Sequence, residues 1–194
     1  MTMILFAALT LLASVIGQPS PGAVRVIVDT SVGAIELEVD LTHAPVTAAN
    51  FLKYVDAGLY DGGRFHRTVR LDNQPNNDVK IEVIQGAANA ERRREFLPPI
   101  ALERTNVTGL SHQDGTVSMA RTGPDSARDE FFICLGDQPS LDFAGARNRD
   151  GQGFAAFGRV VGGMDVVRKI QISPAEGQTL APPIAIRSVR RVQR

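Results

Sequence analysis

Two segments near the amino end of the chain alternate between apolar and polar residues. In residues 24–29 (VRVIVD) and 35–40 (IELEVD), apolar side chains occupy every second position. A period of two is typical of strands that bury one face. The residues between them, 31–33 (SVG), supply a tight turn. We therefore predict an antiparallel β-hairpin.

A helical period follows this hairpin. Thr42 and Pro45 mark the start of a helix, and Gly58 marks its end. The apolar residues spaced three and four apart on one face are Ala48, Phe51, Leu52 and Val55. We expect this helix to cover one mouth of a sheet. A second, shorter helix is predicted over residues 164–170.

The rest of the chain is rich in short β-type runs separated by Gly, Asn, Asp and Pro. These runs are 64–69, 81–85, 116–120, 131–135 and 154–161, and a last strand contains Ile184, Ile186 and Val189. Together with the hairpin they make seven or eight strands against two helices. Such a chain is mainly β, and a closed antiparallel β-barrel would leave it no exposed strand edge.

The amino terminus carries a separate signal. Residues 4–16 (ILFAALTLLASVI) are apolar but too short to span a bilayer comfortably, and small residues follow. We predict a signal peptide over 1–17, a flexible leader over 18–22 and one domain over 23–194, with a periplasmic or secreted location and no membrane contact after cleavage. No Lys or Arg precedes the apolar run, so a retained anchor or a buried strand is the alternative.

Composition narrows the choice of partners. Basic and acidic residues both number 21, so the formal net charge is zero and no affinity for nucleic acid is expected. The single cysteine, Cys134, lies in an apolar run and is predicted to be buried rather than reactive. The three histidines lack the spacing of metal ligands. We therefore expect no metal and no cofactor.

Five short motifs and one helix segment carry a family resemblance. They are Phe65-His66-Arg67, residues 83–86 (VIQG), residues 119–122 (MART), Phe131-Phe132-Ile133, residues 156–167 (AFGRVVGGMDVV) and residues 44–51 (APVTAANF). In this order they resemble the cyclophilins. The resemblance implies a closed eight-stranded antiparallel β-barrel capped by two α-helices. It also implies a monomeric peptidyl-prolyl cis-trans isomerase that acts on proline-containing polypeptides and assists the folding of exported proteins.

The chemistry of such an enzyme explains which side chains it needs. Rotation about an X-Pro bond meets a barrier of about 18–20 kcal/mol from amide resonance, and it takes roughly tens to hundreds of seconds without a catalyst. No covalent bond breaks. Catalysis needs a pocket for the proline ring and donors that favour the twisted amide over the planar one.

The resemblance assigns these roles to particular residues. Arg67 matches the catalytic arginine, and Gln85 matches the glutamine that orients it. Ala120 and Arg121 match a strand edge whose main chain pairs with substrate. Phe132 matches the aromatic floor of the proline pocket and Leu141 its wall. The remaining residues predicted to bind substrate are Val83, Glu130 and Phe154.

Several positions depart from the eukaryotic-type pattern. Glu82 and Val83 replace an aromatic residue and a methionine, which predicts the loss of one apolar wall. Glu130 replaces a glutamine, and we expect its carboxylate to pair with Arg67 or Arg121. Further departures are Ser140 for a tryptophan, Phe154 for a histidine and a longer loop at residues 71–78. These changes bear on efficiency more than on reaction type.

Two other hypotheses remain open. A cyclophilin-like barrel of low activity could serve as a chaperone or a proline-peptide binding module, and Glu82 and Glu130 favour it. An unrelated barrel could bind a small apolar ligand, as lipocalins do, but it would need an open interior. The alternating Phe, Ile, Leu and Val of this chain favour a filled one.

Overall fold

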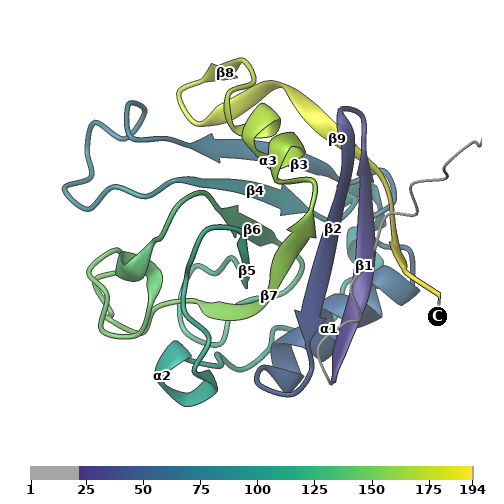
Figure 1. The fold of residues 1–194 in the computed structure, drawn as a ribbon, viewed down its shortest axis with the longest axis horizontal. Coiled ribbons are helices and arrows are strands. Elements are labelled where there is room, and N and C mark those ends of the chain that lie inside the picture. Colours follow the sequence, from purple (N-terminus) through teal and green to yellow (C-terminus); the bar gives the residue numbers. More distant parts are fainter. Residues whose placement is uncertain (1–21, 194) are drawn as a thin grey trace, which may run out of the picture.

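The computed structural model describes residues 22–193, and in them one antiparallel sheet closes on itself (Figure 1). The strands are β1 (Ala23–Thr30), β2 (Gly33–Asp40), β3 (Arg64–Val69), β4 (Val83–Ala87), β5 (Thr116–Met119), β6 (Phe131–Cys134), β7 (Ala155–Gly162), β8 (Ala175–Glu176) and β9 (Thr179–Arg191). The α-helices are α1 (Pro45–Asp56), α2 (Thr105–Thr108) and α3 (Met164–Gln171), and two 3₁₀ turns are η1 (Ala90–Glu95) and η2 (Pro139–Leu141).

The strand order shows how the barrel closes. Within the described residues, neighbouring strands follow the order β1-β2-β7-β5-β6-β4-β3-β9, and β1 pairs back with β9. The two-residue strand β8 adds only a short hairpin to β9. The predicted closed eight-stranded antiparallel β-barrel is therefore confirmed, and closure satisfies the hydrogen-bonding edges that an open sheet would expose.

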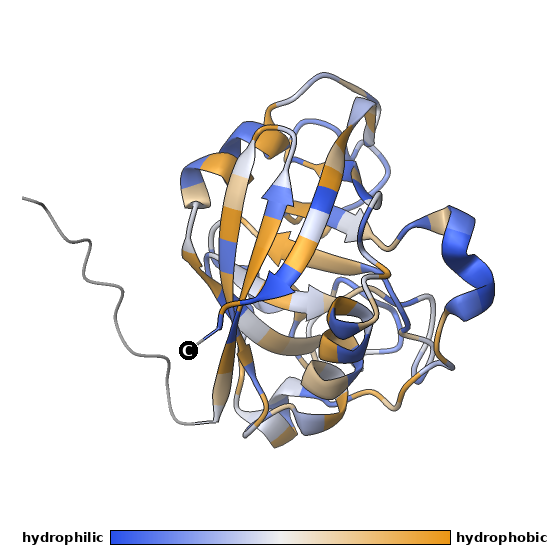
Figure 2. Ribbon diagram, turned by 90° about the vertical axis from the view of Figure 1, so that its right-hand side faces the viewer, coloured by the Kyte–Doolittle hydropathy of each residue, from blue (hydrophilic) through white to orange (hydrophobic). Residues whose placement is uncertain are grey.

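The predicted first hairpin is present, and its turn is one residue shorter than predicted. Val26 lies opposite Leu37, and Thr30 lies opposite Gly33, so Ser31 and Val32 alone form the turn. Alternation along both strands sends every second side chain inward. In Figure 2, hydrophobic and hydrophilic residues alternate along the strands.

Two helices cover the barrel at opposite ends of β2. Helix α1 starts shortly after β2 ends and packs against β2, β7 and β9. Helix α3 packs against β2, β3 and β4, and Val166 of α3 contacts Gly33 at the start of β2. Both helices were predicted, with ends within one or two residues of those observed. Thr42 does not cap α1; the helix begins at Pro45, and the Glu103 carboxylate accepts hydrogen bonds from the backbone N–H groups of its first turn.

The barrel interior is packed with apolar side chains. Phe51 of α1, Phe131 of β6 and Phe157 of β7 are fully buried. The Phe51 ring packs against the other two, with centroids 5.6 Å from Phe131 and 5.1 Å from Phe157. Aliphatic residues of β1, β2 and β9 fill the remaining space. A lipocalin-like barrel with an open interior is therefore contradicted.

The predictions for the amino terminus fall outside the structure. The predicted signal peptide, residues 1–17, and all of the predicted leader except Gly22 lie beyond the described residues. Across residues 22–193, no helix combines the length and the apolarity needed to cross a membrane. Cys134 is fully buried, as predicted, and burial raises the pKa of its thiol.

Candidate functional site

A second apolar cluster lies on the outer face of the barrel wall. Phe131 and Ile133 of β6 point into the core, whereas Phe132 and Cys134 alternate to the outside. There they join Val69, Val83 and other buried residues. This outer cluster is the floor of a cavity of about 220 Å³, here called the Arg67 pocket.

Arg67 reaches this outer face because strand β3 contains a β-bulge. Phe65 pairs with Gly86, but Arg67 pairs with Gln85, so His66 is an extra residue on β3. Side chains two apart on a regular strand share a face, and one inserted residue reverses the alternation. Phe65 therefore points into the core, while Arg67 joins Gln85 and Val83 on the outside.

The Arg67 guanidinium is held by two neutral amides. Nε and Nη2 donate to Oε1 of Gln178 at 3.0 and 2.6 Å, and Nη1 donates to Oε1 of Gln85 at 2.9 Å. A guanidinium has five N–H groups, so one on Nη1 and one on Nη2 stay available. Burial lowers the Arg67 pKa and the negative charge of Glu130 opposes this shift, but an arginine stays charged at physiological pH.

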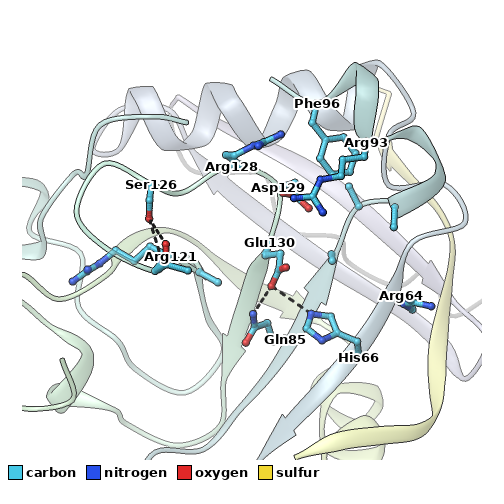
Figure 3. Close-up of a pocket in the computed structure, with 15 residues that line it drawn as sticks. Arg64, His66, Gln85, Arg93, Phe96, Arg121, Ser126, Arg128, Asp129 and Glu130 are labelled. Atoms are coloured by element: carbon cyan, nitrogen blue, oxygen red, sulfur yellow. Dashed lines mark hydrogen bonds and ion pairs between the residues drawn. The ribbon is translucent and has the colours of Figure 1, made fainter. Parts of the chain in front are cut away.

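Hydrogen bonds connect Glu130 to Arg67 through Gln85, and the Glu130 charge also acts on Arg67 at a distance. Gln85 Nε2 donates to Glu130 Oε2 at 2.5 Å, and His66 Nε2 lies 3.4 Å from the same oxygen (Figure 3). These partners lower the Glu130 pKa, with His66 the largest cause. The expectation that Glu130 pairs directly with Arg67 or Arg121 is therefore wrong. Its carboxylate instead fixes which way the Gln85 amide is turned.

The aromatic floor is fixed from both sides. The Phe132 ring stacks on His112 at 5.9 Å between centroids and meets the edge of Phe154 at 5.3 Å. His112 is itself fixed by Asp142 Oδ1 at 2.6 Å and Ser118 Oγ at 2.9 Å. With this packing, Phe132 has little rotational freedom and offers a preformed apolar surface.

Ala120 and Arg121 form the strand edge beside the aromatic floor, and one of their two backbone N–H groups is already hydrogen-bonded within the protein. The Ala120 N–H already donates to the Glu130 carbonyl at 2.9 Å. The Arg121 N–H has no acceptor within residues 22–193, so it is the donor that a bound chain can use. The Arg121 side chain is only 2% exposed; its guanidinium forms a double hydrogen bond with the Asp150 carboxylate and lies over the Phe154 ring.

The Arg67 pocket brings together all but one of the residues predicted to form the site. Its lining includes Arg67, Val83, Gln85, Ala120, Arg121, Phe132, Leu141 and Phe154. Glu130 lines the adjoining cavity instead. Glu82 lines neither cavity, since its carboxylate accepts a hydrogen bond from Gln171 of α3.

Sequence reasoning missed four residues of this region. Ile81 lines the pocket and supplies an apolar wall beside Val83. Its signal was present, because Ile81, Val83 and Gln85 alternate in sequence. Arg147, Asn148 and Gln178 carry no comparable signal: they lie in loops distant in sequence, and only the fold brings them to Arg67.

A larger cavity adjoins the Arg67 pocket. It has a volume of about 530 Å³, and Gln85, Ala120 and Arg121 line both cavities. Figure 3 shows charged side chains around it: Asp129 lies between Arg128 and Arg93, and Glu130 and Arg64 lie further along the cavity. Burial raises the Asp129 pKa. Because these three residues line both cavities, the two cavities form one continuous groove on the outer face of the barrel.

The chemistry available in this groove is electrostatic. The pocket presents an apolar floor, a fixed guanidinium with two open N–H groups and a free backbone donor. Over residues 22–193, no three His, Cys, Asp or Glu residues are grouped in a way that could hold a metal ion. The fold and the site therefore define a closed barrel whose outer pocket combines an apolar floor with positively charged hydrogen-bond donors.

Comparison with known proteins identifies the family. Residues 25–191 match the family model described as cyclophilin type peptidyl-prolyl cis-trans isomerase/CLD. Peptidyl-prolyl cis-trans isomerase A of Dickeya dadantii is 36% identical over 202 residues, which cover 98% of either chain. Peptidyl-prolyl cis-trans isomerase B of Escherichia coli is 36% identical over 73% of this chain and 80% of its own length. The chain belongs to the cyclophilin family, and it is a peptidyl-prolyl cis-trans isomerase.

Solved structures agree on the fold. A Cryptosporidium parvum cyclophilin-type isomerase, crystallised in the presence of the dipeptide Ala-Pro, superposes with a TM-score of 0.70. It covers 88% of this chain and 99% of its own, at 18% identity. At that identity the likeness concerns the fold alone.

Proposed function

We propose that the Arg67 pocket is the active site and that it isomerises X-Pro bonds in extended polypeptides. The proline ring rests on Phe132, with Leu141 and Ile81 as walls. The Arg121 N–H and the Ala120 carbonyl bind the substrate main chain. The adjoining cavity takes a neighbouring part of the same chain.

In this proposal Arg67 lowers the barrier by binding the twisted amide more tightly than the planar one. As the X-Pro bond rotates, conjugation is lost and the prolyl nitrogen regains its lone pair. An open N–H of Arg67 can donate to that lone pair, which is not available in the planar state. An interaction made only in the transition state accelerates the reaction.

The observation that carries this proposal is the fixed geometry of Arg67. Its guanidinium is oriented before any substrate arrives, because Gln178 and Gln85 accept three of its N–H groups. A donor that needs no reorganisation contributes more to catalysis than a mobile one. The partial burial of Arg67 strengthens the effect, because there is less water to screen the charge.

NMR exchange spectroscopy on an Ala-Pro peptide tests this function. With catalytic amounts of the protein, the cis and trans proline signals should exchange far faster than in the free peptide. Peaks that shift on binding without faster exchange would favour the alternative, a chaperone or proline-peptide binding module of low activity.

We also propose that the protein is exported and works as a monomer on exported proteins, in the periplasm or outside the cell. The support is the apolar run at residues 4–16 and the small residues after it. Expressed in a Gram-negative host, the mature chain should begin near Gln18 and leave the cytoplasm. A chain that keeps Met1 in the cytoplasmic fraction contradicts export, and size-exclusion chromatography tests the monomer.

A further inference from the structure

The Arg67 pocket has an imbalance of charge. Three arginines line it, Arg67, Arg121 and Arg147, and no aspartate or glutamate does. In the part of the chain that the structure describes, only Arg121 of these three has a carboxylate partner, Asp150, at 2.7 and 2.9 Å. The other two guanidinium groups face the same cavity without an ion pair among residues 22–193.

Arg147 is placed by neutral acceptors. It belongs to the loop between η2 and β7, and its Nη1 donates to Gln74 Oε1 at 3.0 Å and to the Val79 carbonyl at 2.6 Å. Gln74 is buried and also bonds the backbone at Ile81. The side chain of Arg147 is thus anchored to the loop between β3 and β4.

The anchoring leaves one edge of Arg147 free. Both of its hydrogen bonds use Nη1, so the fork formed by Nε and Nη2 has no acceptor in the described part of the chain. This fork matches the two oxygens of a carboxylate. Burial and the positive charge of Arg67 both lower the Arg147 pKa, so the two guanidinium groups repel each other across the pocket. An anion bound between them would relieve that repulsion.

We propose that Arg147 binds a substrate carboxylate next to the proline, so that the enzyme prefers X-Pro bonds flanked by a negative charge. This inference rests on the proposed function, since it needs the proline on Phe132. The carboxylate comes from one of two sources: an acidic side chain directly after the proline, or the free carboxyl terminus of a chain that ends in proline. Both present the same planar group to the fork.

Four peptides separate these sources. Two are Ala-Ala-Pro-Glu-Ala amide and its Gln counterpart, which differ in side-chain charge alone. Two are Ala-Ala-Pro with a free carboxylate and Ala-Ala-Pro amide. NMR gives the exchange rate of each peptide with the enzyme, and chemical-shift titration of the same samples gives the dissociation constant. The second readout measures the preference even if turnover is absent.

The variants are Arg147→Gln, which removes the charge, and Arg147→Lys, which keeps the charge but not the fork. Arg149→Gln is the matched control, because Arg149 is an exposed arginine in the same loop. We expect wild type to bind at least one acidic peptide about tenfold more tightly than its neutral partner, the scale of one charge-assisted contact. Arg147→Gln should abolish this ratio, Arg147→Lys should retain part of it and Arg149→Gln all of it.

The affinity ratios either identify the source of the carboxylate or overturn the proposal. A ratio that appears with the Glu peptide assigns the side chain as source, and one that appears with the free terminus assigns the terminus. Equal affinity for acidic and neutral peptides in wild type, or a ratio unchanged in Arg147→Gln, overturns the proposal. If Arg147 only braced the loop, its replacement would weaken all four peptides alike. Loss of exchange on the neutral peptides in wild type would instead count against the proposed isomerase site.

Discussion

At the scale of single residues, catalysis in this account depends on what holds Arg67. Gln178 accepts two of its N–H groups, and Gln178 Nε2 donates to the Asn73 carbonyl at 3.1 Å. One amide therefore joins the guanidinium to the loop that follows β3. We regard Gln178 as a positioning residue, since it acts on the substrate only through Arg67.

Replacing Gln178 tests this role. In Gln178→Ala the guanidinium gains rotational freedom, so kcat should fall about tenfold, by roughly 1.4 kcal/mol of lost transition-state binding, while KM changes little. Gln178→Glu keeps an acceptor for Arg67 but loses the donor to Asn73. Retained kcat in Gln178→Glu identifies the contact with Arg67 as the important one; equal losses in both variants would show that Gln178 merely supports the loop.

The neighbouring residues Phe131 and Phe132 have different expected roles: Phe131 stabilises the core and Phe132 binds substrate. Phe131 is fully buried among Phe51, Tyr60 and Phe65, whereas Phe132 borders the Arg67 pocket. Phe131→Leu should lower the free energy of unfolding by roughly 1–2 kcal/mol with little effect on KM. Phe132→Leu should mainly raise KM. Urea unfolding and exchange kinetics on both variants check this, and the same KM in the two would contradict the alternation described here.

At the scale of elements, an ion pair between Arg121 and Asp150 helps to hold the loop between η2 and β7. The Arg121 guanidinium, helped by the Gln152 N–H, lowers the pKa of the Asp150 carboxyl to about 2 from an ordinary 3.8. A depressed carboxyl pKa adds stability that is present above the ordinary value and is lost as pH falls towards the lowered one.

Asp150→Asn should therefore be less stable than wild type near neutral pH, and the difference should shrink below pH 3.8 and vanish near pH 2. Urea unfolding followed by circular dichroism across that range measures it. The exposed Asp78 provides a control, Asp78→Asn, which should follow wild type throughout. A difference that stays constant down to pH 2 would mean that the ion pair contributes nothing.

The sequence predicted the elements better than the loops. Strand β3 was predicted with its observed ends, because the run from Arg64 to Val69 is bounded by Gly63 and a polar loop. A period of two cannot show the bulge at His66, however, because pairing with β4 defines it. The cap of α1 by Glu103 was missed for the same reason: Glu103 lies 57 residues after Val46 and 56 residues after Thr47, whose N–H groups it binds.

In the site, too, the sequence predicted the residues on strands better than those in loops. Residues on strands, such as Gln85 and Phe132, could be placed from motif and alternation. The direct pairing expected for Glu130 was wrong, because the Gln85 amide lies between its carboxylate and the Arg67 guanidinium. The positions of Arg147 and Gln178 depend on contacts among three loops that are distant in sequence. Local sequence patterns do not predict such contacts.

At the scale of the whole molecule, the barrel separates two functions between its two faces. The filled interior provides stability, and the outer wall carries the Arg67 pocket and the adjoining cavity. Adjacent strands β3, β4 and β6 hold Arg67, Gln85 and Phe132 in fixed relation. A rigid scaffold of this kind suits a reaction that needs only positioning and charge.

The most direct test of the central claim is the exchange rate of an Ala-Pro peptide with Arg67→Ala, compared with wild type. Arg70→Ala is the control, because Arg70 directly follows the same strand, β3, and lines neither cavity. We predict that Arg67→Ala unfolds at nearly the wild-type urea concentration and still binds the peptide, but that kcat falls about a hundredfold or more, as expected when one preorganised donor is removed. Wild-type kcat in the folded Arg67→Ala variant would contradict the account.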